Sequence, residues 1–225
     1  MTTDGELYRL MSWLSPAYPV GAYAYSHGLE NAVENGLVVD TATACDWIAT
    51  VISSGNGQSD LVFVCAAWDR AADPQGLVDL NEFALAFQPT AELRLESSAQ
   101  GKAFTKVSAD AWYCRAIDTL EKLPGAEIAY PVAVGALAAG HGICRQTTML
   151  AYAHGFASNL VSAAVRLVPL GQTDGQRITA SLMPIAEAAV AEAMDTPFED
   201  VATATPMVDI ASMNHESQYT RLFRS

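Results

Sequence analysis

The chain has little charge, and above all little positive charge. Charged residues make up only 16% of the 225, and 25 Asp and Glu stand against 12 Lys and Arg, which gives a net charge of −13. Nucleic acids and anionic membrane surfaces both need clustered Lys and Arg, so neither is expected as a partner. Because 51% of the residues are hydrophobic, we expect some apolar surface to be shared with a protein partner.

Cysteine is also scarce, and its four positions contain no CxxC pair. Their apolar or small neighbours are typical of reduced core thiols in a cytoplasmic protein, which we expect for Cys45, Cys65, Cys114 and Cys144. The opening residues MTTDGELYRL lack the apolar core of a secretory signal. The uncharged stretches 128–144 and 146–165 are too rich in polar, small or helix-breaking residues for membrane spans. The first of these is better explained by close helix packing through small residues.

Alternating polar and apolar residues, the pattern of a half-buried strand, are missing. Apolar residues instead recur with a helical period, as in Leu7, Leu10, Met11 and Leu14. We therefore predict a single all-α domain over residues 1–225, a bundle of about ten helices. The predicted helices include one after an N-cap at Asp40 or Thr41, one capped by Asp79, one long or broken helix over 90–123, one capped by Asp174, and one ending near Tyr219.

Complete motifs for a nucleotide or a metal are missing as well. The segment GALAAGHG, residues 135–142, has the glycine spacing of a P-loop but places His141 and Gly142 where Lys and Ser or Thr are needed. The histidines are scattered and form no HExxH, whereas structural zinc usually takes four ligands. We expect no resident cofactor or metal, although a transient metal contact stays open.

The strongest enzymatic alternative is a serine nucleophile. The segment AYSHG, residues 24–28, approaches the G-x-S-x-G elbow with Ser26 at the nucleophile position, but that elbow needs a parallel sheet. Asp209 and His215 follow in a suitable order, yet a chain of this length readily supplies such a pair. The main expectation is a protein that is not an enzyme and has no catalytic residue.

Two stretches stand out from this background. SPAYPVGAYAYSHGLE, residues 15–30, combines helix-breaking prolines with three tyrosines, and predicts either a connection packed on the core or a recognition surface; the next helix is expected to start near Ser26. HESQYTRLFRS, residues 215–225, brings Arg221 and Arg224 after a long stretch without Lys or Arg. It predicts either a frayed terminus or an anchor for a partner.

Four motifs in order, SPAYPVGAYAYSHGLE, ELRLESSAQG, RLVPLGQTDGQ and HESQYTRLFRS, resemble the urease accessory protein UreF family over about residues 7–225. Ala17 and Tyr18 depart from the residues common in the family. The resemblance implies an all-α, non-enzymatic assembly factor that acts as a homodimer. It also implies a bridge between a UreD- or UreH-type accessory protein and the nickel-carrying GTPase UreG. That complex docks on apo-urease and couples GTP hydrolysis to nickel insertion.

The resemblance also implies partner-binding residues. Tyr23 and Arg221 match positions linked to complex formation, and Glu30 and Arg166 match positions that affect control of the GTPase. Neighbouring residues follow as further partner-binding candidates: Ser26, His27, His215, Glu216, Arg224 and Ser225. We expect the tail to become ordered when the partner arrives. Glu30 and Arg166 could instead have local structural roles, and a serine hydrolase using Ser26 or a chaperone that binds nickel directly stays open.

Overall fold

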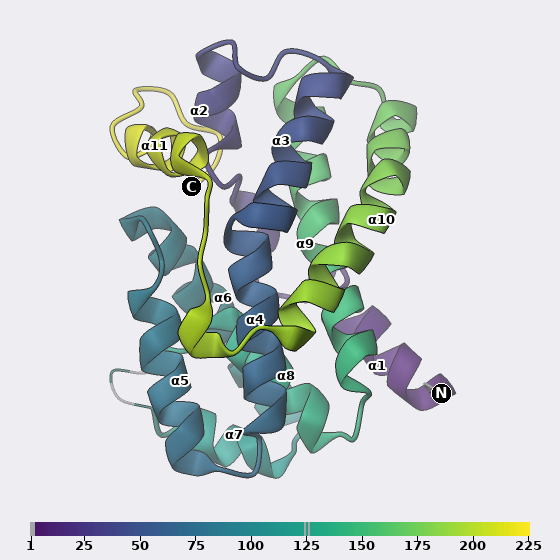
Figure 1. The fold of residues 1–225 in the computed structure, drawn as a ribbon, viewed down its shortest axis with the longest axis vertical. Coiled ribbons are helices and arrows are strands. Elements are labelled where there is room, and N and C mark those ends of the chain that lie inside the picture. Colours follow the sequence, from purple (N-terminus) through teal and green to yellow (C-terminus); the bar gives the residue numbers. More distant parts are fainter. Residues whose placement is uncertain (1–2, 124, 126) are drawn as a thin grey trace.

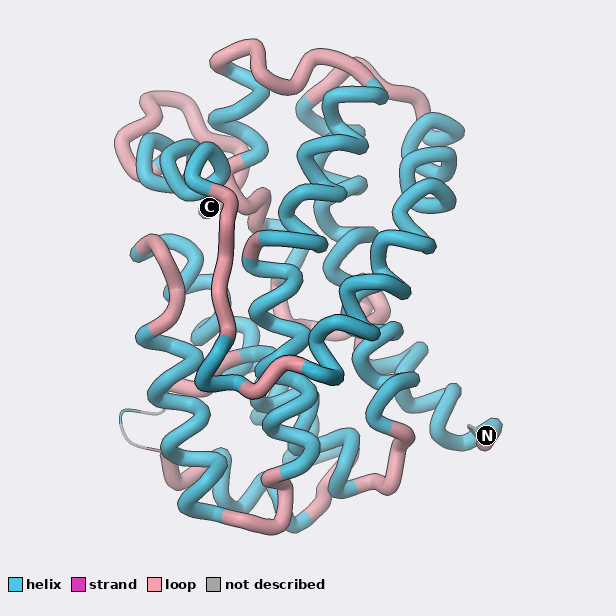
Figure 2. The backbone as a smooth tube through the Cα atoms, viewed as in Figure 1, coloured by secondary structure: helices cyan, strands magenta, loops and turns pink. Residues whose placement is uncertain are grey.

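A computed structural model of the chain describes residues 3–123, 125 and 127–225, and this part contains helices and loops but no strand (Figure 2). The predicted all-α fold is confirmed. The described residues form eleven α-helices and two short 3-10 helices: α1 (Asp4–Trp13), η1 (Ala22–Ala24), α2 (Leu29–Glu34), α3 (Thr41–Ser54), α4 (Asn56–Asp69), α5 (Pro74–Ala86), α6 (Ala91–Ala111), α7 (Arg115–Leu120), α8 (Tyr130–Gly140), α9 (Arg145–Leu167), α10 (Gln172–Asp195), η3 (Phe198–Asp200) and α11 (Pro206–His215).

The core is built around α4, which is buried along nearly its whole length and packs against α8, α9, α3 and α10. The contact with α8 is close because Gly135 has no side chain: a Cβ there would lie 2.3 Å from the carbonyl oxygen of Val64. Small residues let two helix backbones approach in this way. The interpretation of the stretch 128–144 as a closely packed helix is confirmed.

Several predicted helix ends are corrected. Asp40 does cap α3, accepting a hydrogen bond from the backbone N–H of Thr43, but α5 follows Asp73 rather than Asp79. The segment 90–123 is broken into α6 and α7. At α10 the N-cap is Gly171, and Asp174 lies three residues inside, where its carboxylate accepts a hydrogen bond from the Gly171 N–H. Pro74 at the start of α5 favours the earlier helix start, because proline suits the first turn of a helix.

The apolar stripe predicted for α1 is only half buried. Leu10 and Trp13 lie in the core, whereas Leu7 and Met11 are 51% and 67% exposed. The reason is that α1 lies at the edge of the bundle against α9 (Figure 1). The apolar side chains of Leu7 and Met11 therefore remain on the surface at this edge.

The structure also tests the predictions that the four cysteines are buried and that no helix spans a membrane. Cys65 and Cys114 are buried and Cys45 is half-buried, but Cys144 is exposed at the start of α9, so the core prediction is wrong there. Among the described residues, no helix combines the length and the apolar character that a membrane span requires.

The last helix ends at His215 instead of near Tyr219, and the chain continues as a non-helical tail to Ser225. α2, α11 and the C-terminus lie at one corner of the molecule, with the N-terminus on the opposite side (Figure 1). Segments nearly two hundred residues apart in the sequence thus meet at this corner.

Candidate functional site

The two unusual sequence stretches form a single site. We call it the tail clasp and define it as Glu30 of α2, Glu92 and Glu96 of α6, His215 of α11, and tail residues 221–225. Glu30, Glu92, Glu96 and His215 are all buried. Buried charged groups are stable only when they are paired and hydrogen-bonded, so each of their contacts defines how the tail is held.

A left-handed turn brings the first stretch to the tail. His27 and Gly28 have φ values of 51° and 72°, so α2 starts at Leu29 and not near Ser26 as predicted. This turn directs the backbone N–H of Ser26 to the carbonyl oxygen of Ser225 at 2.9 Å, and the Ser26 hydroxyl donates to the same oxygen. The backbone N–H of Arg224 donates to the carbonyl of Ala24. The chain end is therefore tied to the segment before α2.

Glu30 binds the tail through its backbone. Oε1 accepts a hydrogen bond from the N–H of Leu222 at 2.7 Å, and Oε2 accepts one from the N–H of Phe223 at 2.9 Å. Hydrogen bonds to an ionised carboxylate are roughly twice as strong as neutral ones. Glu30 consequently acts as the main acceptor for the tail, which is a local structural role within this chain.

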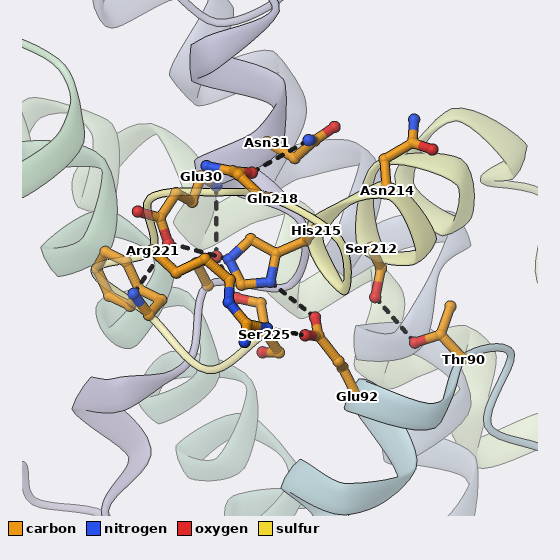
Figure 3. A network of polar contacts seen from close by, with 12 residues as sticks. Glu30, Asn31, Thr90, Glu92, Ser212, Asn214, His215, Gln218, Arg221 and Ser225 are labelled. Carbon is orange, nitrogen blue, oxygen red and sulfur yellow. Dashed lines mark hydrogen bonds and ion pairs between the residues drawn. The ribbon is translucent and has the colours of Figure 1, made fainter.

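His215 lies between two carboxylates, as Figure 3 shows. Its Nδ1 is 2.8 Å from Oε2 of Glu92, and its Nε2 is 3.0 Å from Oε2 of Glu30. Both ring nitrogens of His215 are thus engaged by carboxylate oxygens. The second oxygen of Glu92 accepts a hydrogen bond from Arg221 at 3.0 Å. Side chains of α11 and the tail thus contact the carboxylates of α2 and α6.

Glu96 joins the tail to the turn before α2. One oxygen lies 2.9 Å from Nε2 of His27 and accepts a hydrogen bond from Gln100, and the other accepts a hydrogen bond from the Ser225 hydroxyl at 2.9 Å. Burial lowers the pKa of His27, but the charge of Glu96, its hydrogen bond and the charge of Asp60 outweigh burial, so the pKa is raised. The pairing of His27 with Glu96 thus favours the charged imidazole.

Arg166 of α9 connects the tyrosine-rich segment with the tail. Its guanidinium donates to the carbonyl of Tyr23 at 2.8 Å and lies 4.3 Å from the centre of the Phe223 ring. It also donates to the Ser162 carbonyl in the last turns of α9. Stacking on an aromatic face and donating in one plane are properties of Arg that Lys lacks. Arg166 therefore holds Tyr23 and Phe223 in a fixed relation.

The ten sequence-predicted residues divide into an outer and an inner set. Tyr23 is 67% exposed, and the outer set consists of Tyr23, Arg166, Glu216, Arg221 and Arg224. The inner set is buried and consists of Ser26, His27, Glu30, His215 and Ser225. In contrast to the expectation that the tail orders on partner arrival, it is already packed in the free chain. The inner residues can influence a partner only by positioning the outer ones.

The residues that sequence reasoning missed are Glu92, Glu96 and Asp60. Glu92, Glu96 and Gln100 recur every fourth residue within and around ELRLESSAQG, so they share one face of α6. Asp60 is an acid within the otherwise buried α4. Polar residues repeated on an inward helix face are the signal that would have identified the clasp.

The enzymatic and metal-binding alternatives gain nothing from this geometry. Both nitrogens of His215 face glutamates, and the Ser26 hydroxyl is directed at a tail carbonyl, so these two residues do not form a nucleophile and base. Within residues 3–123, 125 and 127–225, no three His, Cys, Asp or Glu side chains come together as a metal-binding group.

Fold and site together define a helical protein that uses buried carboxyl groups to hold its own C-terminal tail near an exposed tyrosine. The family model of UreF matches residues 38–183. Urease accessory protein UreF of Methylorubrum populi is 47% identical over 98% of this chain and 99% of its own length. The UreF protein of Granulibacter bethesdensis is 47% identical over 100% of this chain and 96% of its own length. The UreF protein of Bradyrhizobium diazoefficiens is 44% identical over 97% of this chain and 91% of its own length. The chain belongs to the UreF family of urease accessory proteins, and its role is an accessory one in urease maturation.

Proposed function

We propose that this chain is the bridging component of a urease maturation complex. In this proposal it is a cytoplasmic homodimer that binds a UreD- or UreH-type accessory protein and the GTPase UreG. It then couples GTP hydrolysis to nickel insertion into apo-urease, with no catalytic residue or cofactor of its own. The observation that carries the proposal is the tail clasp of a family member, which leaves Arg221 exposed and holds Phe223 through Arg166 to the exposed Tyr23.

The chemistry of the outer residues suits a protein partner. Tyr and Arg are enriched among the residues that dominate binding energy at interfaces. Leu222, which is 64% exposed, adds an apolar side chain beside Arg221. Because hydrogen bonds to buried carboxyl groups already fix the tail, a partner does not have to overcome the full entropic cost of ordering it.

Exposed apolar side chains elsewhere support self-association. On α11, Met207, Ile210 and Met213 are 53%, 47% and 50% exposed. On α1, which lies on the opposite side of the molecule from α11 (Figure 1), Leu7 and Met11 form a separate exposed apolar pair. Apolar surface of this kind on a chain with few charges is consistent with a homodimer.

The test is association with the purified partners. Tyr23→Ala and Arg221→Ala are each expected to weaken binding of the UreD-type protein by about tenfold or more, as hot-spot truncations do. Tyr113→Ala and Arg177→Ala are matched controls, because both side chains are exposed but lie on other elements. Unchanged binding by Tyr23→Ala and Arg221→Ala, or an equal loss in the controls, would contradict the proposal.

A further inference from the structure

A cavity lies directly beside the tail clasp. Its volume is about 250 Å³, and its walls come from the segment 13–27 and from α4, α6, α8 and α9. Tyr23, Pro16 and His154 are exposed lining residues, whereas Asp60 and Glu96 are buried ones. The cavity therefore leads from the surface around Tyr23 to two buried carboxyl groups.

The two carboxyl groups have very different surroundings. Glu96 is satisfied by His27, Gln100 and Ser225. Asp60 accepts a hydrogen bond from the Tyr152 hydroxyl at 2.6 Å on Oδ2, but Oδ1 has no hydrogen-bond partner among the described residues. Buried polar atoms are normally partnered, so an orphaned carboxyl oxygen calls for an explanation.

Among the side chains that the structure describes, the lining carries two unpartnered ring nitrogens, Trp13 Nε1 and His27 Nδ1, and unpartnered acceptor oxygens. Oδ1 of Asn56, another lining residue, is also without a partner in the described part of the chain. None of the lining residues is Lys or Arg. Burial raises the pKa of Asp60 to about 7, against the opposing effects of the Tyr152 hydroxyl and the charge of His27, while the charge of Glu96 raises it further. Asp60 is thus a buried acid without a full counter-charge.

We propose that this cavity receives a basic side chain, Lys or Arg, of the protein that docks over Tyr23. The proposal rests on the proposed function above and adds the chemistry of the contact. An ammonium or guanidinium group would supply the missing donors to Asp60 and Asn56. The rings of Tyr130, Tyr152 and Phe156 also line the cavity, and aromatic walls suit both the cation and its aliphatic stem.

A basic side chain explains the cavity better than a metal ion. A bound metal needs three or more converging protein ligands. The described residues contain no such group of His, Cys, Asp and Glu. A side chain that arrives from a partner needs only the acceptors already present and an open path to them, which the exposed rim at Tyr23 provides.

The proposed contact makes association depend on pH. Asp60 must be ionised to pair with a cation, and with a pKa of about 7 its ionised fraction rises about tenfold from pH 6 to pH 8. The groups that face it are His27, Glu96 of α6, Tyr130 of α8 and Tyr152 of α9. His27 loses positive charge in the same direction, which also favours a basic guest. Affinity is thus expected to increase by about tenfold over this range.

The decisive experiment compares the wild-type chain with Asp60→Asn in binding the purified UreD-type protein by calorimetry at pH 6, 7 and 8. Asn keeps the volume and an acceptor for Tyr152 but removes the charge. The variant is expected to bind about 30-fold more weakly or worse at pH 8, the effect of losing one partner of a buried charge pair. Its affinity should change little with pH. Glu187→Gln, an exposed acid on α10, is the matched control and should bind as wild type.

The outcomes separate this proposal from the proposed function. If Arg221→Ala loses binding while Asp60→Asn binds as tightly as wild type at pH 8, the basic-side-chain proposal is overturned and the bridging role stands. If the effect of Asp60→Asn appears only with added Ni²⁺ and disappears with a chelator, the cavity holds a metal ion and the proposal is overturned. If the wild-type chain binds no partner, both proposals fail. Melting curves confirm that the variant is folded.

Discussion

At the scale of single residues, Glu30 shows how a charged side chain can organise a distant segment. Its carboxylate accepts hydrogen bonds from the backbone N–H groups of Leu222 and Phe223 and also contacts His215. A carboxylate can accept at all of these positions, whereas an amide has one acceptor oxygen and two N–H donors. Residue type at position 30 therefore affects how firmly the tail is held.

Replacing Glu30 by Gln is expected to loosen the tail. One of the two backbone N–H groups then faces an N–H group of the amide, and the loss of charge weakens the other contacts, so we expect a decrease of about 2 kcal/mol in the free energy of unfolding. Hydrogen exchange should be faster at the amides of Leu222 and Phe223. Glu34→Gln, on the exposed side of the same helix, is the control. Slow exchange at both tail amides in Glu30→Gln would contradict this role.

The raised pKa of Asp60 predicts how the free energy of unfolding depends on pH. Its pKa is raised by burial from 3.8 to about 7, so the folded chain retains a proton that the unfolded chain releases. The contribution of Asp60 to the free energy of unfolding is therefore fully present below pH 3.8 and is lost as the pH rises to about 7. The raised pKa of His27 acts in the same direction.

Urea denaturation of wild type and Asp60→Asn between pH 5 and pH 8 measures this contribution. Asn cannot ionise, so the variant should gain stability relative to wild type as the pH rises, and the difference should level off above about pH 7. A difference that stays constant over the range, or shrinks as the pH rises, would show that Asp60 is not the buried acid described above.

At the scale of elements, the close approach of α2 and α11 forms the frame of the clasp. Gly28 has φ of +72°, and a Cβ there would lie 2.8 Å from the backbone nitrogen of Ser212. Gly36, at the other end of α2, has φ of +71° but open space around it. The two glycines therefore share a strained backbone conformation and differ only in packing.

Replacing Gly36 and Gly28 by Ala separates the cost of a left-handed backbone from the cost of disturbed packing. Gly36→Ala is expected to cost about 1–2 kcal/mol from the left-handed backbone alone. Gly28→Ala should cost about 1–3 kcal/mol more, because α11 must move away. Denaturant unfolding of both variants gives the comparison. Equal losses of stability would mean that α2 and α11 are not in close contact in solution.

The elements also show what the sequence reveals and what it does not. The helical period identified α1 and α3, and Asp40 marked the start of α3, because these signals are local. Which face of α1 is buried depends on its place at the edge of the bundle, and Leu7 and Met11 give no local sign of it. The turn at His27 that delays α2 is likewise enforced by contacts with a tail nearly two hundred residues later.

In the candidate site, too, the sequence indicates which residues matter but not how they are arranged in the fold. Tyr23, Glu30, His215 and Arg221 were identified from the motifs, but their roles differ because burial separates them. Glu30 and His215 hold the structure together, whereas Tyr23 and Arg221 reach the surface. The glutamates of α6 were missed because a carboxylate's partners are set by the folded arrangement of three helices and the tail.

At the scale of the whole molecule, acidic groups outnumber basic ones by 25 to 12. Part of this excess is buried in the clasp, where His215, His27 and Arg221 face it. The rest leaves the molecule with a negative field that attracts basic surfaces. A protein with few charges, exposed apolar helix faces and a preformed tail is suited to association.

The central claim is that a partner docks on the surface formed by Tyr23 and the tail. Hydrogen exchange of the chain, alone and in complex with the UreD-type protein, tests it most directly. Binding is expected to slow exchange in residues 21–25 and 219–225, with little change in α5 and α7 at the other end of the molecule. Slower exchange in α5 and α7, with residues 21–25 and 219–225 unaffected, would contradict the account.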